Sequence, residues 1–514
     1  MPEENAQNHV KGSENVILKN PCFEDTVEVE RRTIDEDLKV DNNKASIGLK
    51  NCSYLFYLST SAALVGGALN FGISVGSMAN TLALVKKEFR SSDLQMSVLV
   101  SGNPIGGLIG VLVAGFMADW LGRRTTMILN AVPFVVGSIL MSTAKQLVPM
   151  VIGRVLVGIG VGVGSVVTNV FLSEVSPVSV RGGIGALYGV LLCVGTLLSF
   201  LLSMPQIMGQ GELGWRLFFG LPIVTAVYQS FVLFFCPESP KYLALKKGDF
   251  KLAKKSLTKY RVSVEQSEED ALKQNLEESL GQKSKVVSLT ELLSDSRLRL
   301  ALAIGIGLNA GQQLSAINGI LAYAPEIFSQ AGVGDPSLAT LLCGVSRIIG
   351  AVCGAVLVDR LGRRTIMWSG FLVLSVSCFL TAVSQICAGG VGSCKSQWNA
   401  TLAIVAVLTF CFVISASAST IPWIIVAEIF PLEARGKGLS ISVASHWIFH
   451  SLAVLFFDSV DDALQPYTFI LFGGIMFVSF VAVVLFVPET KLKTVEQISE
   501  ELRHQANKCL PIVF

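Results

Sequence analysis

Charge is scarce in this sequence. Asp, Glu, Lys and Arg make up 15% of its 514 residues, and the formal net charge is +2. No basic patch is interleaved with aromatic side chains, so we expect no nucleic-acid partner. The four histidines and eleven cysteines form no CxxC pair or other metal-binding pattern, so we expect no metal site and no cofactor. Catalytic triads and phosphate-cradling loops are missing as well, which argues against an enzyme.

One glycine-rich run has a composition similar to that of a nucleotide-binding loop. Gly158, Gly160, Gly162 and Gly164 alternate with apolar residues, without the G-x-G-x-x-G spacing, a preceding strand or a following soluble helix. Small residues let helices approach one another closely in lipid. We therefore interpret this run as a helix-packing surface.

Long apolar runs are what the sequence has in abundance. Hydrophobic residues make up 51% of it and the mean hydropathy is +0.60, which is far from the composition of a soluble domain. A helix of about 20 apolar residues crosses about 30 Å of hydrocarbon. Twelve such runs lie near 53–77, 95–118, 126–144, 148–172, 183–205, 216–236, 298–322, 338–358, 366–387, 401–427, 438–457 and 466–487. The sequence therefore predicts an all-α membrane protein with twelve transmembrane helices.

Three charged motifs occur twice, in the same order, each at the end of an apolar run. The second copies begin 240, 254 and 251 residues after the first. The pairs are DWLGRRTTM (Asp119–Met127) and DRLGRRTIM (Asp359–Met367), EVSPVSVRG (Glu174–Gly182) and EIFPLEARG (Glu428–Gly436), and PESPK (Pro237–Lys241) and PETKL (Pro488–Leu492). This repeat predicts two copies of a six-span unit. Because six is even, both copies have the same orientation and all of these motifs face one side.

The repeat and the polar segments divide the chain into five parts. The first fifty residues have no apolar period and no signal-peptide pattern, which predicts a disordered tail. Leu272, Leu276 and Leu280 form an amphipathic stripe in a polar middle segment, which we interpret as short helices bracing the two bundles, or alternatively binding a partner. The parts are a tail (1–50), an N-terminal six-helix bundle (51–236), linker helices (237–297), a C-terminal six-helix bundle (298–488) and a second tail (489–514).

Lysine and arginine in the short loops are more frequent on the side of the repeated motifs. The positive-inside rule then places both tails and the linker helices in the cytoplasm, although a basic first outer loop weakens the count. We expect a multi-pass protein of the plasma membrane. Asn399 begins a possible glycosylation site on the outside, where Cys387 and Cys394 are candidates for a disulfide.

The charged residues of the repeated motifs are expected to act as gates. Asp and paired Arg at the cytoplasmic span ends can form ion pairs with nearby Glu, which would lock the bundles together and break when the bundles rock apart. The alternative is that the arginines only set the orientation in the membrane. The candidates are Asp119, Arg123, Arg124, Arg154, Glu174, Arg181, Glu238, Asp359, Arg363, Arg364, Glu428, Arg435 and Glu489.

The ordered motifs resemble those of the sugar porters of the major facilitator superfamily, and among these the facilitative glucose transporters. The match covers nearly all of 53–495. Its motifs are DWLGRR, RVLVGIG, EVSPVSVRG, PESPKYL, QQLSAINGILAY, DRLGRR, IPWIIVAEIF and PETKLKTVEQI. The resemblance implies two six-helix domains, a central sugar site near mid-membrane, and transport by alternating access.

Three amide side chains interrupt the seventh apolar run. Gln312, Gln313 and Asn318 can donate and accept hydrogen bonds at once, as sugar hydroxyls do, and carry no charge that must be desolvated. Hydrogen bonding between packed helices is the alternative. The resemblance implies that these positions bind the sugar. It also implies a pathway position for Trp423, after a helix-breaking proline, and Asn70 of the first span is a further substrate-binding candidate.

Several positions depart from the family pattern. Ser417–Thr420 replace its Gly-Pro-Gly-Pro, so we expect that helix to bend less or elsewhere. Phe200 and His446 stand where the family has a sugar-contacting glutamine and an asparagine. Arg347 stands at a sugar-binding asparagine, and an intramembrane arginine costs at least about 2.5 kcal/mol without water or a partner. It could bind an anionic or different sugar, snorkel, or pair with exposed carbonyls.

Coupling to protons is not expected. Proton-coupled relatives have an aspartate in the first span, and this sequence has Ser74 there, with no Asp or Glu in that helix. The sequence thus predicts a uniporter for a hexose, first of all glucose, that works in a lipid bilayer. A same-fold carrier of an organic anion or modified sugar, and a sugar-binding nutrient sensor, remain as alternatives, and the oligomeric state stays open.

Overall fold

A computed structural model describes residues 49–209, 211–281, 287–315, 317–389, 397–491 and 493–513. The chain divides into two compact units, Met1–Asn51 and Cys52–Phe514. All but the last two residues of the predicted first tail lie outside the described residues, and so does Cys394. The second unit contains every element discussed below.

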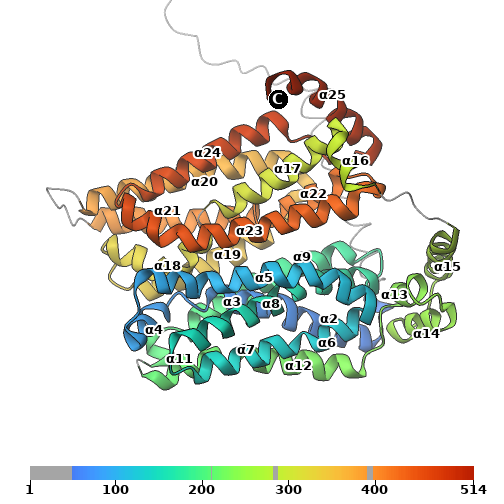
Figure 1. Cartoon of the computed structure of the whole chain (residues 1–514), viewed down its shortest axis with the longest axis horizontal. Helices are drawn as coiled ribbons and strands as arrows, with labels where there is room; N and C mark the ends of the chain where they lie inside the picture. Colours follow the sequence, from blue (N-terminus) through green and yellow to red (C-terminus); the bar gives the residue numbers. More distant parts are fainter. Residues whose placement is uncertain are drawn as a thin grey trace, which may run out of the picture. The chain divides into compact units, whose positions relative to one another are not determined.

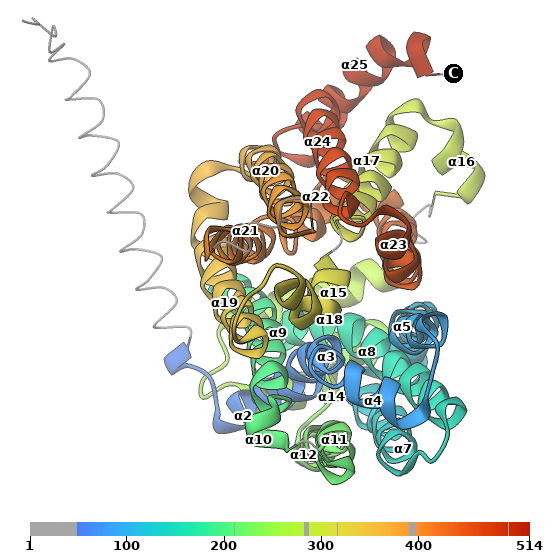
Figure 2. The same cartoon turned by 90° about the vertical axis from the view of Figure 1, so that its left-hand side faces the viewer.

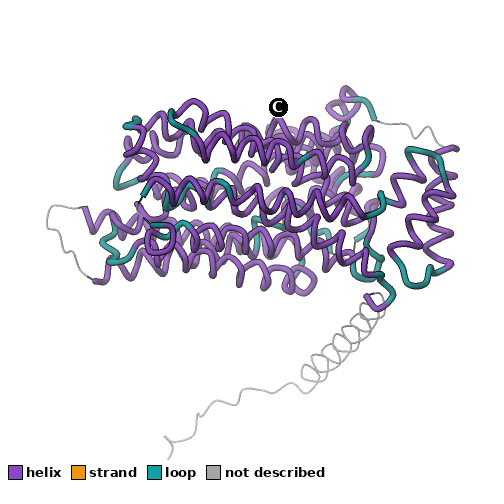
Figure 3. Tube along the Cα trace, turned by 90° about the horizontal axis from the view of Figure 1, so that it is seen from below, coloured by secondary structure: helices purple, strands orange, loops and turns teal. Residues whose placement is uncertain are grey.

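Helices make up nearly all of the second unit, and no strand occurs in the described ranges (Figure 3). Twelve stretches are long and apolar enough to cross a membrane. Figure 2, which looks nearly along the helices, shows the first six spans grouped together and the last six beside them. The predicted fold class, an all-α membrane protein with twelve transmembrane helices, is confirmed, whereas the five exact part boundaries stay predictions.

The twelve spans are built from one, two or three helices each (Figure 1). The first six are α2, η1 and α3 (Tyr54–Leu64, Val65–Leu69, Asn70–Gly76), α5 (Asp93–Leu121), α6 and α7 (Arg123–Leu129, Ala131–Thr143), α8 (Leu147–Val175), α9 (Arg181–Leu202), and α11 and α12 (Glu212–Phe219, Leu221–Phe235). The last six are α17 and α18 (Ser296–Gln313, Ile317–Gln330), α19 (Pro336–Leu361), α20 (Arg363–Gly389), α21 and α22 (Gln397–Ala416, Ile421–Ile429), α23 (Leu432–Leu464) and α24 (Thr468–Phe486).

The remaining helices lie between and after the spans. They are α4 (Leu82–Phe89), α10 (Pro205–Met208), α13 (Pro240–Leu245), α14 (Phe250–Tyr260), α15 (Gln266–Gly281), α16 (Leu289–Ser294) and α25 (Val495–Val513).

The glycine run of α8 packs against α5. A Cβ added at Gly158 would lie 2.1 Å from the carbonyl oxygen of Asn103, and one at Gly162 would lie 2.2 Å from that of Gly107. Any side chain at these glycines would therefore push the two helices apart. The interpretation of the run as a packing surface is confirmed.

The tenth span breaks where its family motif is replaced. α21 ends at Ala416 and α22 begins at Ile421, so the expectation that the helix would bend elsewhere was wrong, whereas a weaker bend stays a prediction. Pro422 has no N–H to continue the helical ladder. The hydroxyl of Ser417 also donates to the carbonyl of Val413 at 2.7 Å, which ties the end of α21 to its own last turn.

The linker helices α13, α14 and α15 lie together at one end of the spans (Figure 1). The hydroxyl of Tyr260 donates to the carbonyl of Pro237 at 2.5 Å, and the backbone N–H of Ser53 donates to the carbonyl of Tyr260 at 3.0 Å. Arg261 binds Glu268 with its Nε 3.0 and 3.1 Å from the two carboxylate oxygens. These contacts fasten the linker to the start of the first span.

Candidate functional site

A cluster of amide side chains forms where the seventh span is broken. α17 ends at Gln313 and α18 begins at Ile317, so Gln312 and Gln313 lie in the last turn of one helix and Asn318 in the first turn of the next. Asn318 Nδ2 donates to Gln313 Oε1 at 2.5 Å. Gln313 Nε2 lies 3.1 and 3.0 Å from the two ring nitrogens of His446 on α23. Two of the three predicted amides are therefore brought together, with His446 beside them.

Aromatic rings border this amide cluster. The ring of Trp423, on α22, lies 5.0 Å from the ring of His446. Trp447 lies 5.7 Å from His446, stacks on His450 at 5.7 Å, and also stacks on Phe71 of α3 at 5.7 Å. Because Phe71 belongs to the first six spans and the other rings to the last six, the cluster adjoins a contact between the two halves.

Trp447 and His450 were not predicted from the sequence as residues of this site. The run SHWIFH places two histidines four residues apart, on one side of a helix, inside an otherwise apolar span. That spacing was the available signal. It was not decisive, because aromatic residues in a membrane helix are usually packing residues.

Several buried polar atoms of this region have no hydrogen-bond partner among the described residues. They are Gln312 Oε1, an acceptor, Trp447 Nε1, a donor, and His450 Nδ1, whose role depends on the tautomer. A buried donor or acceptor without a partner costs about 1–3 kcal/mol. A ligand rich in hydroxyl groups can satisfy both kinds at once, because each hydroxyl donates and accepts.

Asn70 and Arg347 form hydrogen bonds with residues outside the amide cluster. Asn70 Oδ1 accepts a hydrogen bond from Thr225 of α12 at 2.5 Å, inside the first half. Arg347 Nη1 donates to the hydroxyl of Thr196 on α9 at 3.2 Å, and its Nε donates to Ser415 on α21 at 3.4 Å. Arg347 is 95% buried, and its guanidinium joins the two halves, since α9 and α19 belong to different halves.

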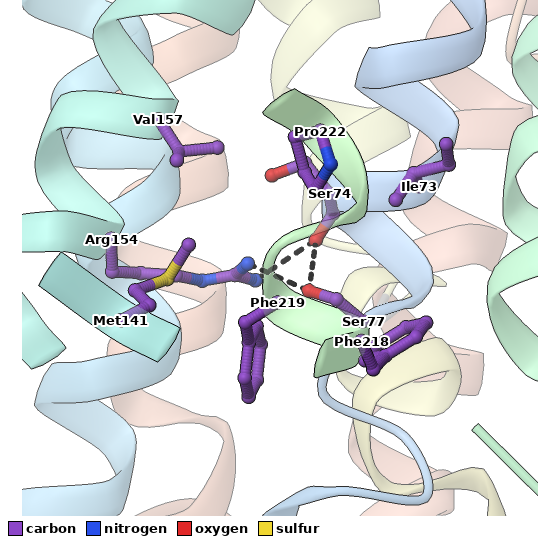
Figure 4. Close-up of a pocket in the computed structure, with 9 residues that line it drawn as sticks. All are labelled: Ile73, Ser74, Ser77, Met141, Arg154, Val157, Phe218, Phe219 and Pro222. Atoms are coloured by element: carbon purple, nitrogen blue, oxygen red, sulfur yellow. Dashed lines mark hydrogen bonds between the residues drawn. The ribbon is translucent and has the colours of Figure 1, made fainter. Parts of the chain in front are cut away.

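Arg154 reaches from α8 to the end of α3 (Figure 4). Its Nη1 donates to Ser77 Oγ at 2.7 Å and its Nη2 to the backbone oxygen of Ser74 at 3.0 Å. The adjoining cavity is about 10 Å³, room for about one water, so it cannot hold a sugar. Arg154 thus makes hydrogen bonds to neutral groups in place of the expected ion pair, and its part in gating stays a prediction.

The charged motifs of the first half form one connected cluster. Arg123 pairs with Glu174 at 3.2 Å and with Asp119 at 3.3 Å. Glu238 accepts a hydrogen bond from the backbone N–H of Arg124 at 2.9 Å, at the N-terminus of α6. A carboxylate at this position satisfies an unpaired helical N–H and is favoured by the helix dipole.

The second half repeats this arrangement. Arg363 pairs with Glu428 at 3.6 Å, and Glu489 accepts from the backbone N–H groups of Arg363 and Arg364 at 3.0 and 3.1 Å, at the N-terminus of α20. Each ion pair of these two clusters joins helices of the same half. A lock between the bundles stays a prediction.

The remaining gate candidates differ in their surroundings. Arg181 is exposed, and Arg435 Nε donates to the carbonyl of Phe430 at 3.3 Å. The side chain of Asp359 lies outside the described residues, although its helix is described.

Comparisons with known proteins agree over most of the chain. Residues 49–502 match the family described as "Sugar (and other) transporter". The chain is 31% identical over 453 residues to solute carrier family 2, facilitated glucose transporter member 2, of Gallus gallus, with 87% of this chain and 84% of the relative covered. It is 34% identical over 418 residues to facilitated glucose transporter protein 1 of Caenorhabditis elegans, with 80% and 81% covered.

A solved structure has the same fold. The inward-open conformation of the xylose transporter XylE from E. coli matches with a TM-score of 0.71 and 23% identity, covering 87% of this chain and all of that one. At this identity the match shows the fold alone.

Proposed function

The chain belongs to the sugar (and other) transporter family, and from this premise we propose that it carries a hexose, first of all D-glucose, down its concentration gradient by alternating access. The facilitated glucose transporters that it matches at 31% and 34% identity support this proposal. The family is one of transporters, not of enzymes.

The amide cluster is the observation that carries the proposal. Gln313 and Asn318 hold each other in place, and Gln312 presents a buried oxygen without a partner in the described part of the chain. These groups are uncharged, so a sugar that loses its hydration here meets replacement hydrogen bonds without the cost of burying a charge. Trp423 supplies a flat apolar face suited to the C–H face of a sugar ring. Asn70 and Arg347 are proposed as further contacts in another conformation of the pathway.

Gating is proposed to use the two charged clusters. Each cluster ties a span end to a helix of its own half, so it keeps that half rigid while the two halves rock against each other. When the pathway closes at their end, residues of the two clusters come together and form additional ion pairs across the halves. The cytoplasm is the proposed side of this end and of both tails, and the plasma membrane the proposed location, from the lysine and arginine bias of the loops.

Arg347 favours a second candidate, a same-fold carrier of an anionic or modified sugar. Its guanidinium is buried, and its hydrogen-bond acceptors within the described residues are the hydroxyls of Thr196 and Ser415. A buried cation without an anionic partner is costly, and an anionic substrate would relieve that cost.

Uptake into proteoliposomes separates the two candidates. Labelled D-glucose is supplied without a proton or sodium gradient, with L-glucose as the control, for the wild type and for Arg347→Asn. Saturable, stereospecific uptake by the wild type supports the hexose uniporter. An inert wild type together with an active Arg347→Asn variant would overturn it in favour of a charged or modified sugar.

A further inference from the structure

A second, larger hollow lies away from the amide cluster. A groove of about 850 Å³ runs between α17 and α24, with walls that are almost entirely apolar. From Ser296 to Leu314 the wall on α17 extends for about 27 Å, at 1.5 Å per helical residue. This exceeds the thickness of one leaflet of hydrocarbon, about 15 Å.

Two glycines keep the groove open. A Cβ added at Gly307 of α17 or at Gly474 of α24 would meet nothing within 4 Å. The glycines between α5 and α8 differ, because added Cβ atoms there would collide with backbone of the facing helix. Gly307 and Gly474 therefore do not serve close helix packing, and their effect is to leave space between two membrane-spanning helices.

The surroundings and the ends of the groove indicate what fills it. Both helices are membrane spans, so the groove opens into hydrocarbon, where an unfilled apolar hollow would forfeit van der Waals contacts. Water does not enter an apolar hollow readily, whereas an acyl chain fits it. Ser296 and Arg299 line the end of the groove where Ala506 of α25 also contributes. An arginine at the membrane surface is complementary to a lipid phosphate.

We propose that this groove is a binding site for one phospholipid, with an acyl chain along Gly307 and Gly474 and the phosphate at Arg299. Under the orientation proposed above, the lipid belongs to the cytoplasmic leaflet. Gly311 and Leu314 also line the groove, and Gln312 and Gln313 lie between them in the chain. The lipid thus packs against the segment of α17 that carries Gln312 and Gln313 of the amide cluster.

Photo-crosslinking of the full chain in nanodiscs tests this site. The probe is phosphatidylglycerol with a diazirine in its acyl chain, and labelled peptides are mapped by mass spectrometry. We expect labelling of α17 and α24 along the groove to exceed that of the exposed face of α12 (Phe231, Phe234) by about fivefold or more, because a retained chain occupies the groove longer than a passing one. Equal labelling of the two surfaces would overturn the proposal.

Two variants, one double and one single, test the groove further. Gly307→Leu with Gly474→Leu fills the groove and should abolish the excess labelling, whereas Gly115→Leu, at a glycine on α5 that also faces open space, should preserve it. Persistence of the excess in the filled variant would contradict the site. If the filled variant does not fold, the wild-type ratio still decides.

The headgroup is tested separately. A diazirine diacylglycerol, which lacks the phosphate, should label the groove of the wild type less than phosphatidylglycerol does, and Arg299→Gln should remove that difference. Equal labelling by both lipids in the wild type would overturn the role of Arg299. Crosslinking requires no transport, so its outcome is independent of the proposed sugar.

Discussion

At the scale of single residues, the amides at the end of α17 are not equivalent. Gln313 connects Asn318 to His446, whereas Asn309 on the same helix donates, among the described residues, to its own helix backbone, at the carbonyl of Gly305 at 2.9 Å. We expect Gln313→Ala to raise the KM for D-glucose about fivefold, since a lost neutral hydrogen bond is worth about 1 kcal/mol. Asn309→Ala is the matched control and should leave KM within about twofold. Initial rates of zero-gradient uptake give both values, and equal KM changes in the two variants would contradict the assignment.

Arg347 is a test of coupling between the halves. Its hydrogen bond to Thr196 joins α19 to α9, and a hydrogen bond from a charged group is worth about 1.5–3 kcal/mol. We expect Arg347→Asn and Thr196→Val each to lower kcat/KM, and the double variant to be no worse than Arg347→Asn alone. The coupling energy from this cycle should be about 1 kcal/mol or more. Thr381→Val, which removes a hydroxyl bonded within its own helix, should instead be additive with Arg347→Asn.

At the scale of helices, the repeated glycines explain the repeated motifs. Gly122 and Gly362 precede α6 and α20 with φ of +101° and +87°, values that favour glycine. An added Cβ would also lie 2.4 Å from Glu238 Oε2 and 2.7 Å from Glu489 Oε2, the carboxylates that bind the two helix starts. The motif therefore needs glycine both for the turn and for the approach of the glutamate.

We expect Gly122→Ala and Gly362→Ala to destabilise the protein to a similar extent. With ψ of 159° and 155° these glycines lie in a backbone region that only glycine adopts readily, and another residue there costs about 1–3 kcal/mol before any displacement of the carboxylate. The apparent melting temperature in detergent should fall by about 1–3 °C in each variant. Gly115→Ala, within a helix and facing open space, should leave it unchanged or slightly higher. A fall of the same size in Gly115→Ala would refute the role of the motif glycines.

The helices could be predicted from the sequence far better than the contacts among their side chains. Hydropathy alone predicted all twelve spans, because each span must by itself be long and apolar enough to cross the hydrocarbon. Pro422 indicated a helix break beside Trp423, whereas the hydrogen bond from Ser417 to the carbonyl of Val413 could not be read from hydropathy. Hydropathy also could not predict which residues surround His446. Gln313 on α17 and Trp423 on α22 meet His446 on α23 only through tertiary packing.

At the scale of the whole molecule, the two halves repeat both motif and geometry. Arg123 with Glu174, and Arg363 with Glu428, are equivalent pairs at equivalent span ends. The sequence predicted which residues take part, since the repeat is visible in the letters. It could not predict that each pair stays within its own half, because partner choice depends on how the helices of that half cross. Coupling of the halves must then come from other contacts, such as Phe71 against Trp447.

Transport by such a molecule should not accumulate sugar. Arg154 of α8 donates to the backbone oxygen of Ser74 in the first span and to the hydroxyl of Ser77 just after it, and the first span contains no Asp or Glu that could carry a proton. With an imposed difference of two pH units, a carrier moving one proton per sugar could concentrate it about 100-fold, because each unit is worth about 1.36 kcal/mol. We expect the internal D-glucose concentration to level off at the external one, with or without that gradient. The ratio of internal to external D-glucose is measured from the steady-state isotope content of the proteoliposomes, corrected for trapped volume. A ratio well above one that collapses when a protonophore is added would show that the carrier is proton-coupled.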